Sequence, residues 1–296
     1  MIEKQRLLVI GANGFLGAHV LQAAKSTGIF NVLLADRSAS KDVGIEELDI
    51  ANAASVESAF RRTNPDLVVL LAAISDIDKC ESAPQLAFAV NAQGAENVAN
   101  ACLRHNAKLL FTSTAAVFDG LQHGYREEDQ PTPLSVYGKT KMWAEEAVSS
   151  LLPSAIILRI ALVLGFAGKS GTNAMLDNIV ARWKAGAPVT FPTYELRNPI
   201  DAATLAGVML QMIGDGNPAV RGLYHVGASD SISRYELGIR LASRVGVPAE
   251  LVRAQDTAIP GRAPRGADHF LLTDKIRRDC NIEFETSKRV MERCFE

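Results

Sequence analysis

The chain has 296 residues, of which 48% are hydrophobic and 22% charged, as is usual for a globular protein of one large or two small domains. Its formal net charge of −2 argues against a nucleic-acid or anionic-membrane partner, and the apolar region 151–167 is too interrupted to span a membrane. The four cysteines form no C-x-x-C pair and the charged N-terminus does not resemble a secretory signal, so we expect a cytoplasmic location.

The first predicted element is a strand at 6–10 that leads directly into a glycine-rich turn, GANGFLG at 11–17. An apolar run bounded by glycine is typical of a strand that is buried on both faces. Gly11 allows a tight turn, Gly14 lets a phosphate approach the backbone, and Gly17 lets the following helix pack closely. The free N–H groups at the start of that helix would bind a pyrophosphate.

An acidic residue ends the next apolar run. Asp36 follows Val32-Leu33-Leu34-Ala35, about 20 residues after the glycine turn, where a carboxylate can bind the ribose diol of a dinucleotide. This carboxylate would repel a 2′-phosphate, so NAD is expected over NADP. Arg37 beside it could pair with a phosphate, which keeps NADP possible.

Strands and helices alternate through the first half of the chain. Strands are predicted near 6–10, 31–35, 67–72, 108–112 and 155–161, and helices near 15–26, 52–62, 84–105 and 135–150. This alternation predicts an α/β fold with a Rossmann-like, doubly wound parallel sheet.

Some residues near the predicted strand ends allow two interpretations each. Asp49 could bind an adenine amine or serve as a helix N-cap or loop residue. Ala72 and Ala73 could leave room for a cofactor or allow close helix packing. Asn91 has low helix propensity, and it could bond a neighbouring backbone or lie at the surface.

The pattern changes after residue 165. Helices are predicted near 173–185, 202–213 and 232–245, the last capped by Ser231 or Ser233, and a further buried strand at 222–226. We expect a NAD(P)-binding domain over 1–165, to which 195–226 returns. The segments 166–194 and 227–296 would form a smaller C-terminal substrate-binding domain.

Thr114, Tyr137 and Lys141 are the candidate catalytic residues. Thr114 lies at the end of the fourth strand, and Tyr137 and Lys141 share one helix face. A carbonyl that accepts a hydride needs a proton, which a tyrosine can donate. Lys141 is expected to lower the pKa of Tyr137 from its ordinary value near 10 and to bind a nicotinamide ribose, while Thr114 orients the substrate oxygen. By itself the Tyr-x-x-x-Lys spacing is also that of an ordinary surface pair.

These motifs together resemble the extended short-chain dehydrogenase/reductases, and within them most of all the dTDP-4-dehydrorhamnose reductases. The similar stretches are GANGFLG (11–17), NPDLVV (64–69), DKCES (78–82), AFAVNAQGAEN (87–97), STAAVFDG (113–120), YREED (125–129), PLSVYGKTK (133–141) and GLYHV (222–226). The resemblance implies an NAD(P)H-dependent reductase of a nucleotide-linked 4-keto-6-deoxy sugar, in which Thr114, Tyr137 and Lys141 are catalytic.

The resemblance and the motifs together give a set of expected site residues. The cofactor is expected to contact Gly11, Asn13, Gly14, Phe15, Leu16, Gly17, Asp36, Arg37, Asp49, Ile50, Leu71, Ala72, Ala73, Asn91, Thr112, Tyr137, Lys141, Leu162 and Val163. The substrate is expected to contact Ser75, Thr114, Ala115, Asn173, Arg197, Arg262 and Arg265. A homodimer is expected, and no metal site.

Two departures from the resemblance concern the sugar nucleotide. Ala115-Ala116 follow Thr114 where these reductases usually have an Asp-Tyr pair, and the tail at 261–270 lacks their usual pattern. Arg262 and Arg265 in that tail could bind a pyrophosphate or simply keep the tail soluble. A nucleotide-sugar epimerase and a non-catalytic NAD(P)-binding subunit, similar to the regulatory subunit of methionine adenosyltransferase, stay open. A dehydratase is disfavoured because it would need an acidic pair after Thr114.

Overall fold

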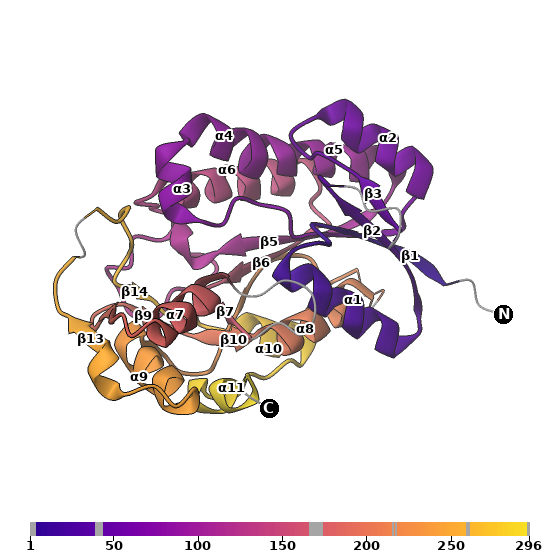
Figure 1. Cartoon of the computed structure of the whole chain (residues 1–296). Helices are drawn as coiled ribbons and strands as arrows, with labels where there is room; N and C mark the ends of the chain where they lie inside the picture. The colour runs from indigo at the N-terminus through magenta and orange to yellow at the C-terminus, as the bar shows by residue number, and fades with distance from the viewer. Residues whose placement is uncertain are drawn as a thin grey trace.

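A seven-stranded parallel sheet forms the centre of the computed structural model, which describes residues 4–38, 44–165, 174–214, 216, 218–258 and 261–294 (Figure 1). Its strand order is β11-β6-β5-β4-β1-β2-β3. The strands are β1 (Gln5–Ile10), β2 (Phe30–Asp36), β3 (Ile45–Glu47), β4 (Leu67–Leu70), β5 (Lys108–Thr114), β6 (Ile156–Ile160) and β11 (Gly222–Val226). All neighbouring pairs are parallel, so the predicted doubly wound sheet is confirmed.

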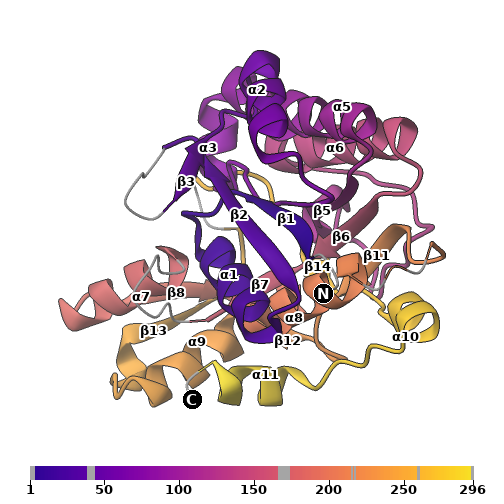
Figure 2. The ribbon, with the colours of Figure 1, turned by 90° about the vertical axis from the view of Figure 1, so that its right-hand side faces the viewer.

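Helices cover both faces of this sheet, as Figures 1 and 2 show. One face carries α2 (Ala53–Thr63), α5 (Gly94–His105) and α6 (Val136–Leu151), and the other carries α1 (Phe15–Thr27) and α8 (Ala202–Gly214). Alternate residues of β1 enter the two cores: Leu7 and Val9 face α1 and α8, whereas Leu8 and Ile10 face α2 and α5. This two-sided burial explains why the strand is a continuous apolar run.

A smaller unit with its own core lies beside the sheet (Figure 1). It comprises α7 (Ala174–Lys184), β8 (Val189–Pro192), α9 (Arg234–Arg244), η4 (Ala249–Leu251) and β13 (Val252–Gln255), and β8 pairs with β13 in parallel. Trp183, Phe191 and Leu241 are buried together in its core. The strand predicted at 222–226 is β11, and it pairs with β6 of the central sheet. The chain therefore forms α7 and β8 of the small unit, returns to the central sheet as β11, and then completes the small unit with α9 and β13. The exact domain limits remain a prediction.

Short strands and helices complete the structure. β7 (Leu162–Leu164) pairs with β10 (Pro199–Asp201), and β9 (Leu196–Arg197) lies between β12 (Ile232–Ser233) and β14 (Asp268–His269). The C-terminal residues that follow residues 261–270 add α10 (Asp274–Cys280) and α11 (Ser287–Arg293). Among the helices of the described residues, none combines the length and the apolar character that crossing a membrane requires.

The helix predicted at 84–105 is interrupted. It consists of α4 (Pro84–Phe88), a π-helical turn η2 (Ala89–Gln93) and α5. Asn91 lies in the π turn and holds the backbone of Ile74, accepting from its N–H at 2.8 Å and donating to its C=O at 3.0 Å. A π turn accommodates an extra residue within a helix, and this one brings the amide of Asn91 to the chain leaving β4.

Three other boundaries differ from the prediction. α3 (Ile77–Ser82) forms where no helix is predicted above, and Asp76 caps it by accepting from Lys79 N at 3.1 Å. β4 ends at Leu70, two residues early, since the next two N–H groups both bond to Ile10 O. α9 begins at Arg234 with Ser233 as its cap, one of the two caps predicted.

Gly17 is the tightest point between the glycine turn and α1. A Cβ atom at Gly17 would lie 2.5 Å from Gly11 O, 2.7 Å from Ala12 O and 2.8 Å from Ala12 Cα. Backbone atoms of a hydrogen-bonded turn cannot move aside as a side chain can, so a methyl group is not accommodated here.

Gly17→Ala is therefore expected to lower the free energy of unfolding by about 2 kcal/mol or more, measured by urea denaturation. Gly207→Ala is the matched control, because Gly207 lies in α8 with no atom within 4 Å of an added Cβ. That variant should gain about 0.5–1 kcal/mol from the better helix propensity of alanine. Equal effects of the two substitutions would contradict the steric argument.

Candidate active site

The glycine turn lies against the end of β4, where the strand order of the sheet reverses. Gly11 has a φ of +95°, and a Cβ atom there would lie 2.7 Å from Ala72 N. Gly14 is the N-cap of α1 and carries no side chain that could cover the first N–H groups of the helix. The turn is therefore a backbone cradle at a helix N-terminus, and the pyrophosphate of a dinucleotide fits it.

Asp36 lies beside this cradle at the end of β2. Its Oδ2 accepts from Asn13 N at 3.1 Å, and its Oδ1 accepts from Ser38 N at 3.4 Å. Asn13 in turn donates its side-chain amide to Ser38 O at 3.1 Å. The structure thus brings Asp36 and the turn together as predicted, with the Arg37 side chain exposed next to them.

Asp49 and Ile50 lie at the start of α2. Asn52, not Asp49, is the N-cap of α2, since Asn52 Oδ1 accepts from Ala54 N and Ser55 N. Asp49 Oδ1 accepts from Ala51 N at 3.0 Å. Ile50 is buried in the core, where it packs on Gly94. The helix-cap interpretation of Asp49 is therefore wrong, and its side chain remains partly exposed.

The end of β7 meets the start of α1 on the other side of the cradle. An added Cβ at Gly165 would lie 3.0 Å from the ring of Phe15, so these two segments are in contact. Leu162 and Val163 in β7 are partly buried, as are Phe15 and Leu16. The predicted cofactor residues from these two elements are thus placed close together.

Thr114 and Tyr137 meet at the end of β5. Thr114 is the last residue of β5 and is 8% exposed, and its hydroxyl is hydrogen-bonded to the Tyr137 phenol. Burial raises the pKa of Tyr137 to about 12, although the bond to Thr114 works in the opposite direction. The phenol is therefore protonated at neutral pH. This differs from the expected lowering of its pKa, because desolvation of the phenolate dominates.

Several contacts fix the N-terminus of α6, which carries Tyr137. Ser135 caps the helix by accepting from Gly138 N at 3.1 Å, and Glu81 Oε1 of α3 accepts from Val136 N at 2.7 Å. A Cβ at Gly138 would lie 2.1 Å from Ala116 O, so the helix touches the chain that leaves β5. A glycine directly after Tyr137 is what lets the phenol approach Thr114.

Lys141 lies one turn after Tyr137 and is 2% exposed. Its Nζ is 4.1 Å from the centre of the Phe111 ring. Burial lowers the pKa of Lys141 to about 7, and the nearby Glu145 carboxylate partly offsets this effect. Because burial disfavours the charged form of Lys141, the amine is only partly protonated at neutral pH, and a smaller fraction carries the charge that the sequence suggested would act on Tyr137.

Asn91 and Thr112 form hydrogen bonds that connect neighbouring segments of the site. Asn91 is 2% exposed, which rules out the surface interpretation, and besides Ile74 it donates to Thr140 Oγ1 at 3.2 Å. Thr112 donates its hydroxyl to Leu70 O at 3.1 Å, which ties β5 to β4. Leu71, Ala72 and Ala73, which follow β4, are all partly buried.

Arginines gather on the side of the site formed by the tail. Arg262 pairs with the buried Glu195 at 2.9 Å, and Arg265 pairs with Asp78 of α3 at 2.8 Å. Arg197 bonds to the carbonyls of Leu196, Ala267 and Gly266, so it anchors the tail.

Arg234 was missed by the sequence reasoning. It is close enough to Arg262, Arg265 and Glu195 to interact with their charges, and burial lowers its pKa to about 10. Its position at the start of α9 gave no signal, because a charge in a helix's first turn is usually solvated.

The other predicted substrate residues are less well connected to this cluster. Ser75 is exposed between β4 and α3, and Ala115 is buried directly after Thr114. Asn173 lies outside the described residues.

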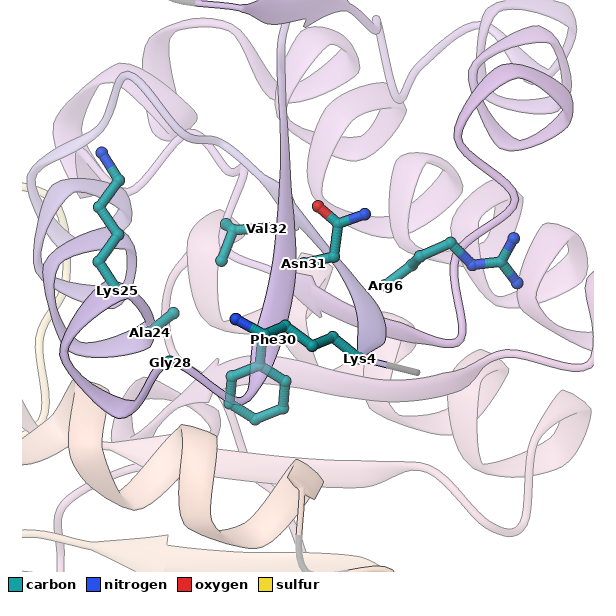
Figure 3. Close-up of a pocket in the computed structure, with 8 residues that line it drawn as sticks. All are labelled: Lys4, Arg6, Ala24, Lys25, Gly28, Phe30, Asn31 and Val32. Atoms are coloured by element: carbon teal, nitrogen blue, oxygen red, sulfur yellow. The ribbon is translucent and has the colours of Figure 1, made fainter. Parts of the chain in front are cut away.

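A pocket at the opposite end of β1 and β2 is separate from these residues (Figure 3). It is lined by Lys4, Arg6, Ala24, Lys25, Gly28, Phe30, Asn31 and Val32. Arg6 is bonded to both carboxylate oxygens of Asp66, at 2.8 and 3.1 Å. The pocket lies at the amino ends of the strands, whereas ligands of such sheets bind at the carboxyl ends.

The profile of one protein family, the RmlD substrate binding domain, matches residues 5–296. The chain belongs to this family. The dTDP-4-dehydrorhamnose reductase of Aggregatibacter actinomycetemcomitans is 32% identical and is aligned over 94% of each chain. Methionine adenosyltransferase 2 subunit beta of Xenopus tropicalis is 29% identical over 94% of this chain and 83% of its own.

A solved family structure is similar over its whole length. The dTDP-4-dehydrorhamnose reductase of Bacillus anthracis, in complex with NADP, is 25% identical, covers 99% of both chains and superposes with a TM-score of 0.86. The predicted kinship with these reductases is confirmed, and with it the class of NAD(P)-dependent oxidoreductases of the extended short-chain type.

The buried Lys141 should make stability depend on pH. Between its folded pKa of about 7 and its ordinary value of 10.5, the unfolded chain holds a proton that the folded protein has released, so stability rises with pH. From pH 7 to 9 the parent should gain roughly 1.4 kcal/mol per pH unit relative to Lys141→Met in urea denaturation. Lys139→Met, an exposed neighbour in α6, should leave this dependence unchanged. Parallel curves for parent and Lys141→Met would refute the lowered pKa.

Proposed function

We propose that the protein reduces the keto group of a nucleotide-linked 4-keto-6-deoxy sugar with NADH or NADPH. The observation that carries this proposal is the meeting of Thr114 and Tyr137 at the end of β5, with Lys141 buried one helical turn away. The relatives named dTDP-4-dehydrorhamnose reductase support the same substrate class.

The chain's own residues supply the proton and hold the oxygen. A bound dihydronicotinamide supplies the hydride that goes to the carbonyl carbon. Tyr137 donates its phenolic proton to the carbonyl oxygen, and its raised pKa means that this proton is present at neutral pH. Thr114, already bonded to Tyr137, orients the same oxygen, and the Lys141 ammonium stabilises the phenolate that remains.

The arginines of the tail are proposed to bind the nucleotide pyrophosphate. Arg234, Arg262 and Arg265 bring three guanidinium groups near two carboxylates, Glu195 and Asp78. An anion is therefore favoured in their midst, and phosphate matches the fork of a guanidinium. In this proposal the segments 166–194 and 227–296 hold the sugar nucleotide.

A regulatory role is the second candidate. The Xenopus tropicalis subunit beta is nearly as similar to this chain as the bacterial reductase is. A protein in that role would bind NAD(P) and a partner enzyme without turning over a sugar. The buried arrangement of Tyr137 and Lys141 favours catalysis, because a desolvated lysine has no evident use in a purely structural site. An epimerase on the same scaffold would show product without net consumption of NADH.

We also propose a homodimer in the cytoplasm. Leu86, Leu103 and Trp143 are large apolar side chains that are 47%, 55% and 48% exposed on α4, α5 and α6, and α6 contacts both α4 and α5. Such exposed apolar residues support an interface between copies, and light scattering tests it against the chain mass of 31.8 kDa. Cys80 and Cys102 are free, buried thiols, which agrees with a reducing compartment.

Tyr137→Phe should abolish turnover while the fold is kept. With NADH and a dTDP-4-keto-6-deoxy sugar, kcat is expected to fall by about 10²–10⁴, followed as loss of absorbance at the NADH band. NADH affinity, measured by fluorescence titration, should change little because Tyr137→Phe leaves the glycine-turn cradle and Asp36 intact. Tyr235→Phe, on α9 of the small unit, is the control and should retain activity. A Tyr137→Phe variant with parental kcat would remove Tyr137 from its proposed role.

Asp36 should set the choice of dinucleotide. Its carboxylate is held next to the cradle by Asn13 N, where it would accept from a 2′-hydroxyl and repel a 2′-phosphate. We expect NADH to bind at least about tenfold more tightly than NADPH, a difference of ~1.4 kcal/mol, and Asp36→Asn to narrow this ratio. Equal affinity of the parent for the two dinucleotides in fluorescence titration would overturn the preference for NAD.

A further inference from the structure

A row of polar side chains crosses the buried sheet beneath α6. Ser113 of β5 is in register with Arg159 of β6, and Arg159 is in register with His225 of β11. All three are 5% exposed or less. The rest of this sheet face is apolar, and burial of polar groups is costly unless they are paired. The row therefore needs an explanation other than packing.

Glu145 of α6 is hydrogen-bonded to two members of this row. Its Oε1 accepts from Ser113 Oγ at 2.5 Å and from Arg159 Nε at 2.9 Å, and its Oε2 accepts from Arg159 Nη2 at 2.6 Å. Glu145 is 5% exposed, and the Arg159 side chain is 3% exposed. Ser113 and Arg159, on two neighbouring strands, hold the carboxylate in one place through these hydrogen bonds.

Lys141 precedes Glu145 by one turn of the same helix. The groups around Lys141 are Tyr137 and Glu145 of α6 and the Phe111 ring of β5, and Arg159 lies behind Glu145. Cys80 of α3 lies near Tyr137. Of these groups Glu145 carries the negative charge, and a buried ammonium requires such a counter-charge.

His225 adds no further charge to the row. Burial and the Arg159 guanidinium lower the pKa of His225 to about 3, so it is neutral at physiological pH. Glu127 accepts from the backbone N–H of His225 at 3.0 Å, and burial raises its pKa. The charge balance near Lys141 is therefore set by Glu145 and Arg159.

We propose that Glu145 is a positioning residue, a buried counter-charge that keeps the Lys141 side chain protonated and in place, and that Arg159 and Ser113 hold it there. Glu145 does not touch the reacting atoms, and it acts through Lys141. Its importance for catalysis rests on the proposed function, whereas its effect on Lys141 does not.

The direct test is the titration of Lys141 in the whole protein. In protein labelled with ¹³C-lysine, the Cε resonance of Lys141 is identified by its loss in Lys141→Met and followed from pH 5.5 to 9.5. Glu145→Gln should lower its titration midpoint by about one pH unit or more, because the ammonium loses its counter-charge. The control is Glu146→Gln, which removes the same charge from the exposed neighbour in α6 and should leave the midpoint unchanged.

Glu145→Gln leaves Arg159 buried without a carboxylate and could unfold the protein. The double variant Glu145→Gln with Arg159→Met removes both charges, and it should still lower the midpoint because Glu145, and not Arg159, is the charge that acts on Lys141. An unchanged or raised midpoint in the folded variants, or an equal shift in Glu146→Gln, would overturn the proposal.

Turnover gives a second readout. The alkaline limb of the pH profile of kcat should move to lower pH in Glu145→Gln, so that activity is regained on acidification. A loss of kcat that is equal at every pH would mean a merely structural role and would overturn the proposal. If the parent turns over no sugar, the proposed function fails while the titration of Lys141 still decides the role of Glu145.

Discussion

The close approach of three strand ends at the glycine turn is the constraint on which the rest of the structure depends. Gly11 N and Ala12 N both donate to Ala35 O, and Leu71 N and Ala72 N both donate to Ile10 O. These shared carbonyls pull the ends of β2 and β4 against the end of β1. Only glycine fits at position 11, since its φ is positive and a Cβ would collide with Ala72. The proposed cradle for the dinucleotide is thus a consequence of how these three strand ends are held together at the edge of the sheet.

Features with a local cause could be predicted from the sequence. The glycine turn and the following helix could be predicted because the backbone conformation there requires glycine, and Asp36 because of its short spacing from the turn. The structure brings the turn and Asp36 together. Six of the seven strands of the central sheet could be inferred in outline, because strands buried on both faces are continuous apolar runs, whereas β3, with three residues, could not. The short strands β9, β12 and β14 could not, because two residues carry no periodicity. The π turn at Asn91 was also out of reach, since its partner Ile74 belongs to another segment.

The electrostatics of the site show the same limit. The helical spacing placed Lys141 on the face of Tyr137, and from this alone a lowered pKa of the phenol was expected. The structure shows that both groups are desolvated, so the phenol holds its proton more firmly and the ammonium holds its own less firmly. Spacing predicts which groups meet, but the sign of a pKa shift depends on burial, and burial depends on the whole fold. Glu145 illustrates this, since its helix position was visible whereas its strand partners Ser113 and Arg159 were not.

Helix α3 connects the two sides of the site. Asp78 on this short helix holds Arg265 and accepts from Ala263 N in the tail, while Glu81 holds the first N–H of α6. Cys80 between them is buried next to Asn91. A displacement of the tail would therefore act on α3, and through α3 on the helix that carries Tyr137 and Lys141. A phosphate would compete with the Asp78 carboxylate for Arg265. Binding of a phosphate by Arg262 and Arg265 would therefore be coupled, through α3, to the position of α6. The glycine turn proposed to hold the dinucleotide, by contrast, is built from backbone atoms of the sheet edge and does not depend on this connection.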